Sequence, residues 1–150
     1  MHEALKEYSL GIKQKVSFGD MDSNGHVNNV WFFRYLENAR VAYYKEMGKF
    51  ELEKEAGLTF VVGSTSCRFK SPVKFPDELL VGVRVSEIYK DRFLMQYLML
   101  SSEQGKVVAK AEATCVCIDK EDGKKATIPS SCLDKIKKIE NTKGSFTFLS

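Results

Sequence analysis

The chain has 150 residues, of which 43% are hydrophobic and 29% charged, and its net charge is +3. This length and composition are typical of a single soluble globular domain covering residues 1–150. The charge is too mild for a nucleic-acid-binding domain, and no stretch approaches the ~20 apolar residues of a membrane span. We therefore expect neither nucleic acid nor a membrane span among its interactions.

The N-terminus has no basic region followed by an apolar stretch, so a secretory signal is not predicted and a cytoplasmic location is expected. The cysteines share no CxxC spacing: Cys67, Cys115, Cys117 and Cys132. Because the chain has only two histidines, His2 and His26, no zinc cluster can be assembled from recognisable pieces. We expect no metal, and we interpret the cysteines as small apolar residues in a reducing compartment.

The first third of the chain predicts one short strand and two helices. Residues 13–18 read as the strand, and a polar, turn-rich loop follows at residues 19–29. Residues 30–47 have helical length, contain no Pro or Gly, and carry apolar side chains over a wide arc, which predicts a helix wrapped on most sides by protein. A shorter helix at residues 50–56 is expected to end at Gly57.

Beyond this point the period changes from helical to strand-like. Four further strands are predicted: residues 59–69, 79–89, 92–101 and 106–118. A last amphipathic helix is predicted at residues 131–139, and residues 141–150 form a tail that we leave unassigned. The elements therefore predict an α+β fold, in which a curved antiparallel sheet of about five strands wraps a long central helix.

Three segments carry a recognisable pattern. Residues 18–29 read FGDMDSNGHVNN, residues 33–40 fit FxYxExAR, and residues 69–79 fit FxxPVxxxDEL. Together with the order of the elements, they resemble the 4-hydroxybenzoyl-CoA thioesterase-like acyl-CoA thioesterases. The resemblance covers most of the chain and implies the hotdog fold, a long helix held in a strongly curved antiparallel sheet.

The resemblance also implies roles for individual residues. The family's catalytic carboxylate, which attacks the thioester or activates water, matches Asp22, four residues before His26. Backbone N–H groups at the start of the long helix, those of Asn29 and Val30, are implied to hold the carbonyl oxygen. The family's active sites lie at a dimer interface, which implies a homodimer or a dimer of dimers. No metal or redox cofactor is implied, since coenzyme A enters only as part of the substrate.

The residue types in the loop also suit thioester hydrolysis when they are considered without the resemblance. Thioester hydrolysis needs a base or nucleophile, and the ionised Asp22 carboxylate can serve. It also needs an oxyanion binder, which the free N–H groups and dipole of a first helical turn supply. Asp20 is the better candidate for tying the loop together. His26 either takes part directly or fixes the loop, whereas Asn28 and Asn29 read as N-cap residues whose backbone can also serve catalysis.

Glu37, two turns into the long helix, is the reserve candidate for a catalytic carboxylate, and its alternative role is an ion pair with Arg40. Because coenzyme A carries several phosphates, basic side chains are expected at the rim of its site. The candidates are Lys90 and Arg92 at one predicted hairpin, and Arg68 and Lys70 in a second basic group. For each of them the alternative is a solvated surface side chain.

The sequence thus predicts hydrolysis of an acyl-CoA or acyl-carrier-protein thioester to a carboxylic acid and a free thiol, with Asp22 as general base or nucleophile. One alternative is a hydratase or dehydratase of the same fold, which would use a histidine with an acidic partner. A second alternative is a non-catalytic module that binds acyl-CoA without turnover. The acyl chain length, and the choice between attack by Asp22 and attack by water, are not predictable from the residues.

Overall fold

The computed structural model describes residues 2–141 and 147–149. In this part of the chain the α-helices are α1 (Asn29–Glu46), α2 (Lys49–Ala56) and α3 (Ser130–Glu140), and the 3-10 turns are η1 (Glu3–Leu5) and η2 (Phe18–Asp20). The strands are β1 (Leu10–Lys15), β2 (Leu58–Phe69), β3 (Glu78–Ile88), β4 (Arg92–Ser101), β5 (Lys106–Asp119) and β6 (Thr147–Phe148).

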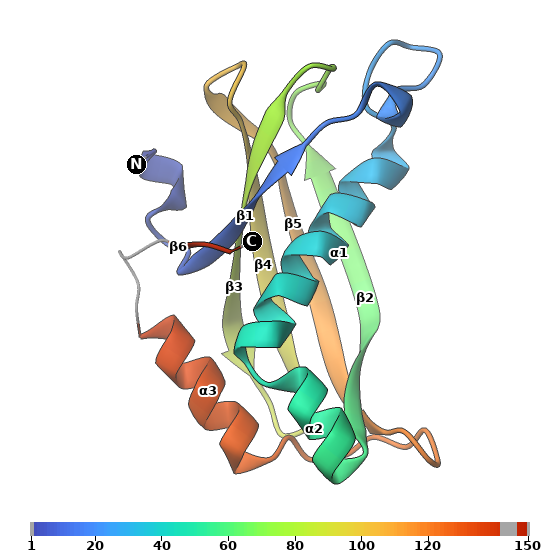
Figure 1. Cartoon of the computed structure of the whole chain (residues 1–150), viewed down its shortest axis with the longest axis vertical. Coiled ribbons are helices and arrows are strands. Elements are labelled where there is room, and N and C mark those ends of the chain that lie inside the picture. Colours follow the sequence, from blue (N-terminus) through green and yellow to red (C-terminus); the bar gives the residue numbers. More distant parts are fainter. Residues whose placement is uncertain (1, 142–146, 150) are drawn as a thin grey trace.

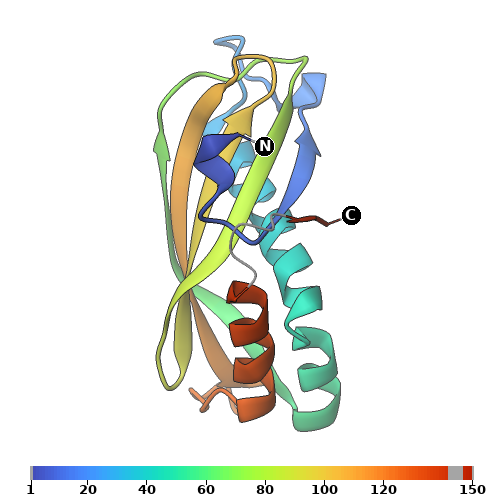
Figure 2. The ribbon, with the colours of Figure 1, turned by 90° about the vertical axis from the view of Figure 1, so that its left-hand side faces the viewer.

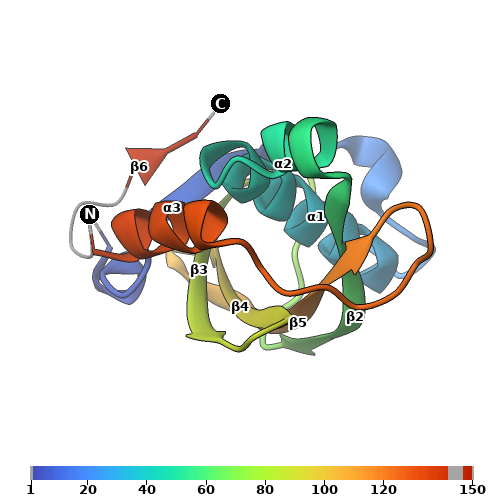
Figure 3. The ribbon, with the colours of Figure 1, turned by 90° about the horizontal axis from the view of Figure 1, so that it is seen from below.

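Within the described residues the strands form one six-stranded sheet in the order β2-β5-β4-β3-β1-β6. Neighbouring strands are antiparallel, except for β1 and β6, which run parallel. The sheet curves, and α1 lies along one of its faces (Figures 1 and 3). The predicted α+β architecture is therefore confirmed. The sheet has one strand more than the expected five, because the end of the unassigned tail pairs with β1 (residues 142–146 lie outside the description).

The first strand lies three residues earlier than the predicted residues 13–18. Leu10 and Ile12 are the buried side chains that fix its register, opposite Val83 and Val81 of β3. After Lys15 the chain turns instead of continuing as a strand, because the Asp20 side chain accepts a hydrogen bond from the backbone N–H of Ser17 and closes η2. The other predicted helices and strands agree with the observed ones to within one residue at each end.

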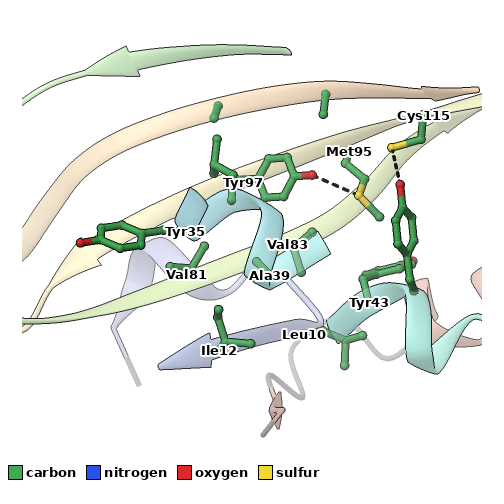
Figure 4. Packing of buried hydrophobic residues seen from close by; sticks show 14 of the residues in the cluster. Leu10, Ile12, Tyr35, Ala39, Tyr43, Val81, Val83, Met95, Tyr97 and Cys115 are labelled. Carbon is green, nitrogen blue, oxygen red and sulfur yellow. Dashed lines mark hydrogen bonds between the residues drawn. The ribbon is translucent and has the colours of Figure 1, made fainter. Parts of the chain in front are cut away.

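One face of α1 is buried against the sheet. The buried side chains recur at helical spacing: Phe32, Tyr35, Leu36, Ala39, Arg40, Tyr43 and Tyr44. Ala39 is fully buried, and its small side chain faces Val81 and Val83, which allows the helix to approach the sheet closely (Figure 4). The expectation of protein on most sides is wrong for this chain, since Val30 is 61% exposed and Val41 is 36% exposed. The sheet covers only one side of the helix.

The other face of the sheet is covered by the N-terminal segment. Leu5 and Tyr8 pack with Leu98 and Leu100 of β4 in a second apolar cluster. Figure 2 shows η1 lying across this face, and α3 beside β3 at the opposite end of the molecule. Gly82 of β3 makes the close approach possible, because a Cβ atom there would lie 3.0 Å from Cγ of Tyr8. The sheet is therefore buried on both faces over part of its length.

Candidate active site

A tight loop precedes α1 and gathers most of the polar residues of the motif. Met21 and Val27 form an isolated antiparallel bridge, and the backbone N–H of Asp22 donates to the carbonyl oxygen of His26 at 2.9 Å. Gly25 has a φ of +74°, which glycine adopts without the steric cost that a side chain brings. The chain therefore reverses direction between Asp22 and His26 and delivers both residues to the N-terminus of α1.

Asp20 anchors this loop to the core. It is 6% exposed and accepts hydrogen bonds from the hydroxyl of Tyr35 at 2.5 Å and from the backbone N–H of Ser17 at 3.1 Å. Burial, and next the hydrogen bond to Asp20, raise the pKa of Tyr35 well above its ordinary value, so the phenol remains a donor. The backbone carbonyl of Asp20 also accepts from the N–H of Asn28. These contacts match the structural role that the sequence predicts for Asp20.

Asp22 is half-buried and is held by two donors. Its Oδ1 accepts from the backbone N–H of Asn24 at 2.9 Å, and its Oδ2 accepts from the side-chain amide of Asn28 at 3.0 Å. Among the ion pairs of the described residues, none involves Asp22. A carboxylate has about four lone-pair sites, so two donors leave acceptor capacity for a water molecule or a substrate.

Asn28 connects this carboxylate to the helix. While its amide nitrogen donates to Asp22, its Oδ1 accepts from the backbone N–H of Val30 at 3.0 Å and caps α1. The N–H of Trp31 donates to the carbonyl oxygen of Asn28. Among the hydrogen bonds of the part of the chain that the structure describes, none uses the backbone N–H of Asn29. Of the two predicted oxyanion donors, Val30 is therefore already engaged by its cap, and Asn29 is the open one.

A pocket of about 340 Å³ opens beside this helix start. It is lined by His26, Val27, Asn29, Phe32, Phe69, Lys70, Ser71, Pro72 and Val73. The structure thus brings His26, Asn29 and Lys70 together around one cavity with apolar walls. Asp22 does not line it directly and is linked to it through Asn28, the neighbour of Asn29.

Glu37 lies apart from this pocket. It lines a second groove of about 230 Å³ between α1 and β2, and its Oε1 lies 3.5 Å from Nη1 of Arg34. The predicted alternative, a pair with Arg40, is wrong. Arg34 and Arg40 are equally distant from Glu37 in sequence, but Arg40 faces the sheet and only Arg34 remains on the exposed side with Glu37.

The basic residues predicted to bind coenzyme A lie in two separate regions of the fold. Arg68 and Lys70 lie at the same end of the sheet as the pocket, and Lys70 lines it. Both also line a larger groove of about 580 Å³ on the outer face of the sheet, together with Lys110. Lys110 was not among the residues predicted from the sequence. Its position opposite Arg68 follows from the pairing of β2 with β5, which strand alternation alone does not reveal.

Lys90 and Arg92 lie elsewhere in the fold. They flank the hairpin between β3 and β4, at the end of the sheet opposite to the loop of Asp22 (Figure 1). Nε of Arg92 is 2.8 Å from Oδ1 of Asp91, and this hydrogen bond lowers the pKa of the Asp91 carboxyl. Within one chain these two residues do not share a ligand site with Asp22.

Comparison with known proteins gives the family. The model of the thioesterase-like superfamily matches residues 16–136. The YsmA protein of Bacillus subtilis is 30% identical over 117 residues, which are 78% of this chain and 78% of YsmA. The long-chain acyl-CoA thioesterase FadM of Escherichia coli is 24% identical over 125 residues, or 83% of this chain and 95% of FadM. A Thermus thermophilus thioesterase, solved in complex with coenzyme A and Zn, has a TM-score of 0.78 at 29% identity, covering 90% of this chain and 96% of that one.

The chain therefore belongs to the thioesterase-like superfamily. This result confirms the predicted hotdog fold and the predicted class of enzyme, a thioester hydrolase. Across residues 2–141 and 147–149, no three His, Cys, Asp or Glu side chains form a group that could hold a metal ion. In the same residues, no helix combines the length and the apolar character needed to cross a membrane.

Proposed function

We propose that this protein hydrolyses acyl-CoA thioesters, with Asp22 as general base or nucleophile. Water cleaves the bond between the acyl carbon and sulfur, and the products are a carboxylate, the free thiol of coenzyme A and a proton. The observation that carries the proposal is the arrangement of the loop. An ionisable carboxylate is held, through Asn28, beside a helix start with an open N–H group and a pocket of about 340 Å³.

In this scheme the thioester carbonyl enters the pocket with its oxygen toward the backbone N–H of Asn29. The positive end of the α1 dipole favours the negative charge that develops on this oxygen during attack. One such donor is worth about 10²–10³-fold in rate. His26 lines the same pocket, so its imidazole is available to orient the carbonyl or to pass a proton to the departing thiolate.

Asp22 then acts in one of two ways. As a general base it takes a proton from the attacking water, which contributes about 10²–10⁴-fold. As a nucleophile it forms a mixed anhydride that water hydrolyses in a second step. In both routes the two bonds from Asn24 and Asn28 fix the orientation of the carboxylate. In a single turnover in labelled water, heavy oxygen in the Asp22 side chain identifies the nucleophilic route, with water opening the mixed anhydride at the aspartyl carbonyl; the general-base route puts the label in the product alone.

For the nucleotide part of the substrate we propose the basic end of β2. Lys70 lines both the pocket and the groove on the outer face, so a pantetheine arm leaving the pocket passes directly to Arg68 and Lys110. Phosphate oxygens pair well with such cations. Alanine substitution of Arg68 or Lys110 should therefore raise KM for acyl-CoA much more than it lowers kcat.

We further propose a homodimer in which two β2 strands pair. β2 is an edge strand, and an unpaired edge is a template for another strand. Val61 and Val62 on β2 are each 40% exposed. Antiparallel pairing about a two-fold axis would bring the hairpin of Lys90 and Arg92 from the second copy toward the pocket end of this chain. We place this dimer in the cytoplasm, where its thiols stay reduced.

The proposal is tested by assaying thiol release from short, long, branched and aryl acyl-CoAs, with enoyl-CoA hydration measured in parallel. We expect thiol release from at least one class and no hydration. Glu46→Gln is the matched control for Asp22→Asn, because it neutralises an exposed carboxylate at the opposite end of α1 from the pocket. Hydration without thiol release, or binding of every acyl-CoA without turnover, would overturn the proposal.

A further inference from the structure

Arg40 is a buried cation whose one hydrogen-bond partner among the described residues is a phenol. Its side chain comes from the sheet-facing side of α1, the residue is 9% exposed, and Nη1 donates to the hydroxyl oxygen of Tyr97 at 3.1 Å. The proton of Tyr97 points to the sulfur of Met95 at 3.3 Å (Figure 4). The chain of donors thus ends at a thioether, which is a weak acceptor and carries no charge.

Two charged residues, Arg34 and Glu37, line the same groove as Arg40, whereas the titratable groups that interact with the guanidinium itself carry no charge in their ordinary protonated form. These groups are Tyr97, Tyr44 and Cys115, and burial raises the pKa of each above its ordinary value. Among the described residues no carboxylate lies within ion-pair distance of Arg40. Glu37, the acidic residue nearest to it in sequence on α1, is paired with Arg34. A buried charge without a counter-charge is strongly unfavourable. Binding of an anion beside Arg40 would therefore be favourable.

A groove leads from the catalytic end of α1 to Arg40. It has a volume of about 230 Å³ and is lined by Val30, Phe33, Arg34, Glu37, Arg40 and Thr65. Along α1 the apolar residues Val30 and Phe33 precede the polar ones, and Val30 directly follows Asn29 in the chain. Arg40 lies eleven positions after Asn29, or about 16 Å along the helix axis. The Arg40 side chain leans back toward the N-terminus, which shortens this span.

We propose that this groove receives the acyl group, and that Arg40 binds a carboxylate at its far end. The preferred substrates are then coenzyme A thioesters of dicarboxylic acids, whose methylene chain passes Val30 and Phe33. A planar guanidinium matches a carboxylate with two parallel hydrogen bonds, and the free donors of Arg40 permit this geometry. A purely aliphatic chain would press a methyl group against an unpaired cation. The inference rests on the proposed hydrolysis, since it places the acyl group beside the Asn29 N–H.

The wild-type protein provides the first test. Suberyl-CoA and octanoyl-CoA have acyl chains of equal length, and adipyl-CoA and hexanoyl-CoA form a second such pair. We expect kcat/KM to favour the ω-carboxyl member of the better pair by on the order of 10²-fold, because a site built for a polar group discriminates strongly against an analogue that lacks it. Equal values, or a preference for the aliphatic member in both pairs, would overturn the proposal.

Arg40→Met removes the charge while keeping a long side chain. It should abolish the preference, with the loss confined to the ω-carboxyl substrate and octanoyl-CoA hydrolysis little changed. Arg34→Met is the matched control, since Arg34 lines the same groove but is exposed and pairs with Glu37. It should keep the preference. If Arg40→Met does not fold, Tyr97→Phe, which removes the phenolic oxygen that accepts from Arg40, is expected to change the ratio between the paired substrates, and an unchanged ratio would contradict the assignment.

Binding of free suberate separates this inference from the proposed hydrolysis. Suberate should raise the Tm of the wild-type protein and of Asp22→Asn, but not of Arg40→Met. If no thioester is hydrolysed and this pattern still appears, the anion site stands and the hydrolase proposal falls. A second copy could instead supply Glu37 as the counter-ion. Strong coupling of Glu37→Gln with Arg40→Met in dimer stability, without any suberate effect, would assign the anion to that copy and overturn the substrate proposal.

Discussion

Asn28→Asp is the substitution that probes the candidate site most selectively. The new carboxylate keeps the acceptor that caps α1, because Asp and Asn are equally good N-cap residues. At the same time it replaces the amide donor that now lies 3.0 Å from Oδ2 of Asp22. Two carboxylates at this distance disfavour each other's ionised form, so the pair should hold a proton to higher pH than Asp22 alone.

The size of the effect follows from the distance. Two unit charges about 4 Å apart repel by about 1 kcal/mol in water and about 4 kcal/mol at the effective dielectric of a protein surface. Asp22 is half-buried, which favours a value between these limits. With about 1.36 kcal/mol per pKa unit, the acidic limb of the pH profile of kcat/KM should move up by roughly one to two units. Lowering the pH through this limb removes activity in both proteins, and the variant loses it at a higher pH than the wild type.

The assay is the loss of thioester absorbance from the best acyl-CoA, measured from about pH 4 to pH 9. The matched control is Ser23→Asp, which adds the same charge on an exposed residue of the same loop without removing a donor from Asp22. Its acidic limb should move less. Thermal unfolding of Asn28→Asp should show that the helix cap survives. An acidic limb that stays at the wild-type position, in a folded variant, would refute the role given to Asp22.

Three further predictions concern stability. Gly82→Ala should lower the free energy of unfolding by about 1–3 kcal/mol through overpacking against the N-terminal segment, whereas Gly19→Ala, with nothing within 4 Å, should change it by less than about 0.5 kcal/mol in urea titrations. Tyr35→Phe should cost about 1.5–3 kcal/mol, because it deprives the buried Asp20 of a donor; a loss below about 0.5 kcal/mol would contradict the anchoring role. Burial raises the pKa of Cys67 from 9.0 to about 11, so above pH 9.0 the unfolded chain loses this proton while the folded chain keeps it. Its contribution to stability should therefore decline between about pH 9 and 11, and Cys67→Ala should show a shallower decline in the same titration.

Much of the fold was predictable because local signals agree. The change from helical to alternating period after Gly57, and the glycines and polar pairs between the later runs, define the helices and strands almost to the residue. The exception is the first strand. Residues 16–18 have the alternation of a strand, but η2 at Phe18–Asp20 depends on a hydrogen bond from Ser17 to Asp20, which periodicity does not encode.

The site was predictable in part. A loop motif before a helix indicated Asp22, His26 and Asn29 as neighbours; the structure places His26 and Asn29 on one pocket and links Asp22 to it through Asn28. The surroundings of Arg40 were not predictable. Its position three residues from Glu37 suggested an ion pair, and only the orientation of α1 against the sheet decides that Arg40 is buried. Partner choice among side chains of equal spacing depends on the tertiary fold.

The central claim is that the carboxylate at position 22 does the chemistry of thioester cleavage. The most direct measurement is the single-turnover rate of Asp22→Asn on the best acyl-CoA, with the affinity for a non-hydrolysable analogue measured alongside. We expect the rate to fall by about 10²-fold or more while the affinity stays near that of the wild type. A folded Asp22→Asn protein that retains more than about a tenth of the wild-type rate would contradict the account and would move the catalytic role first to Glu37.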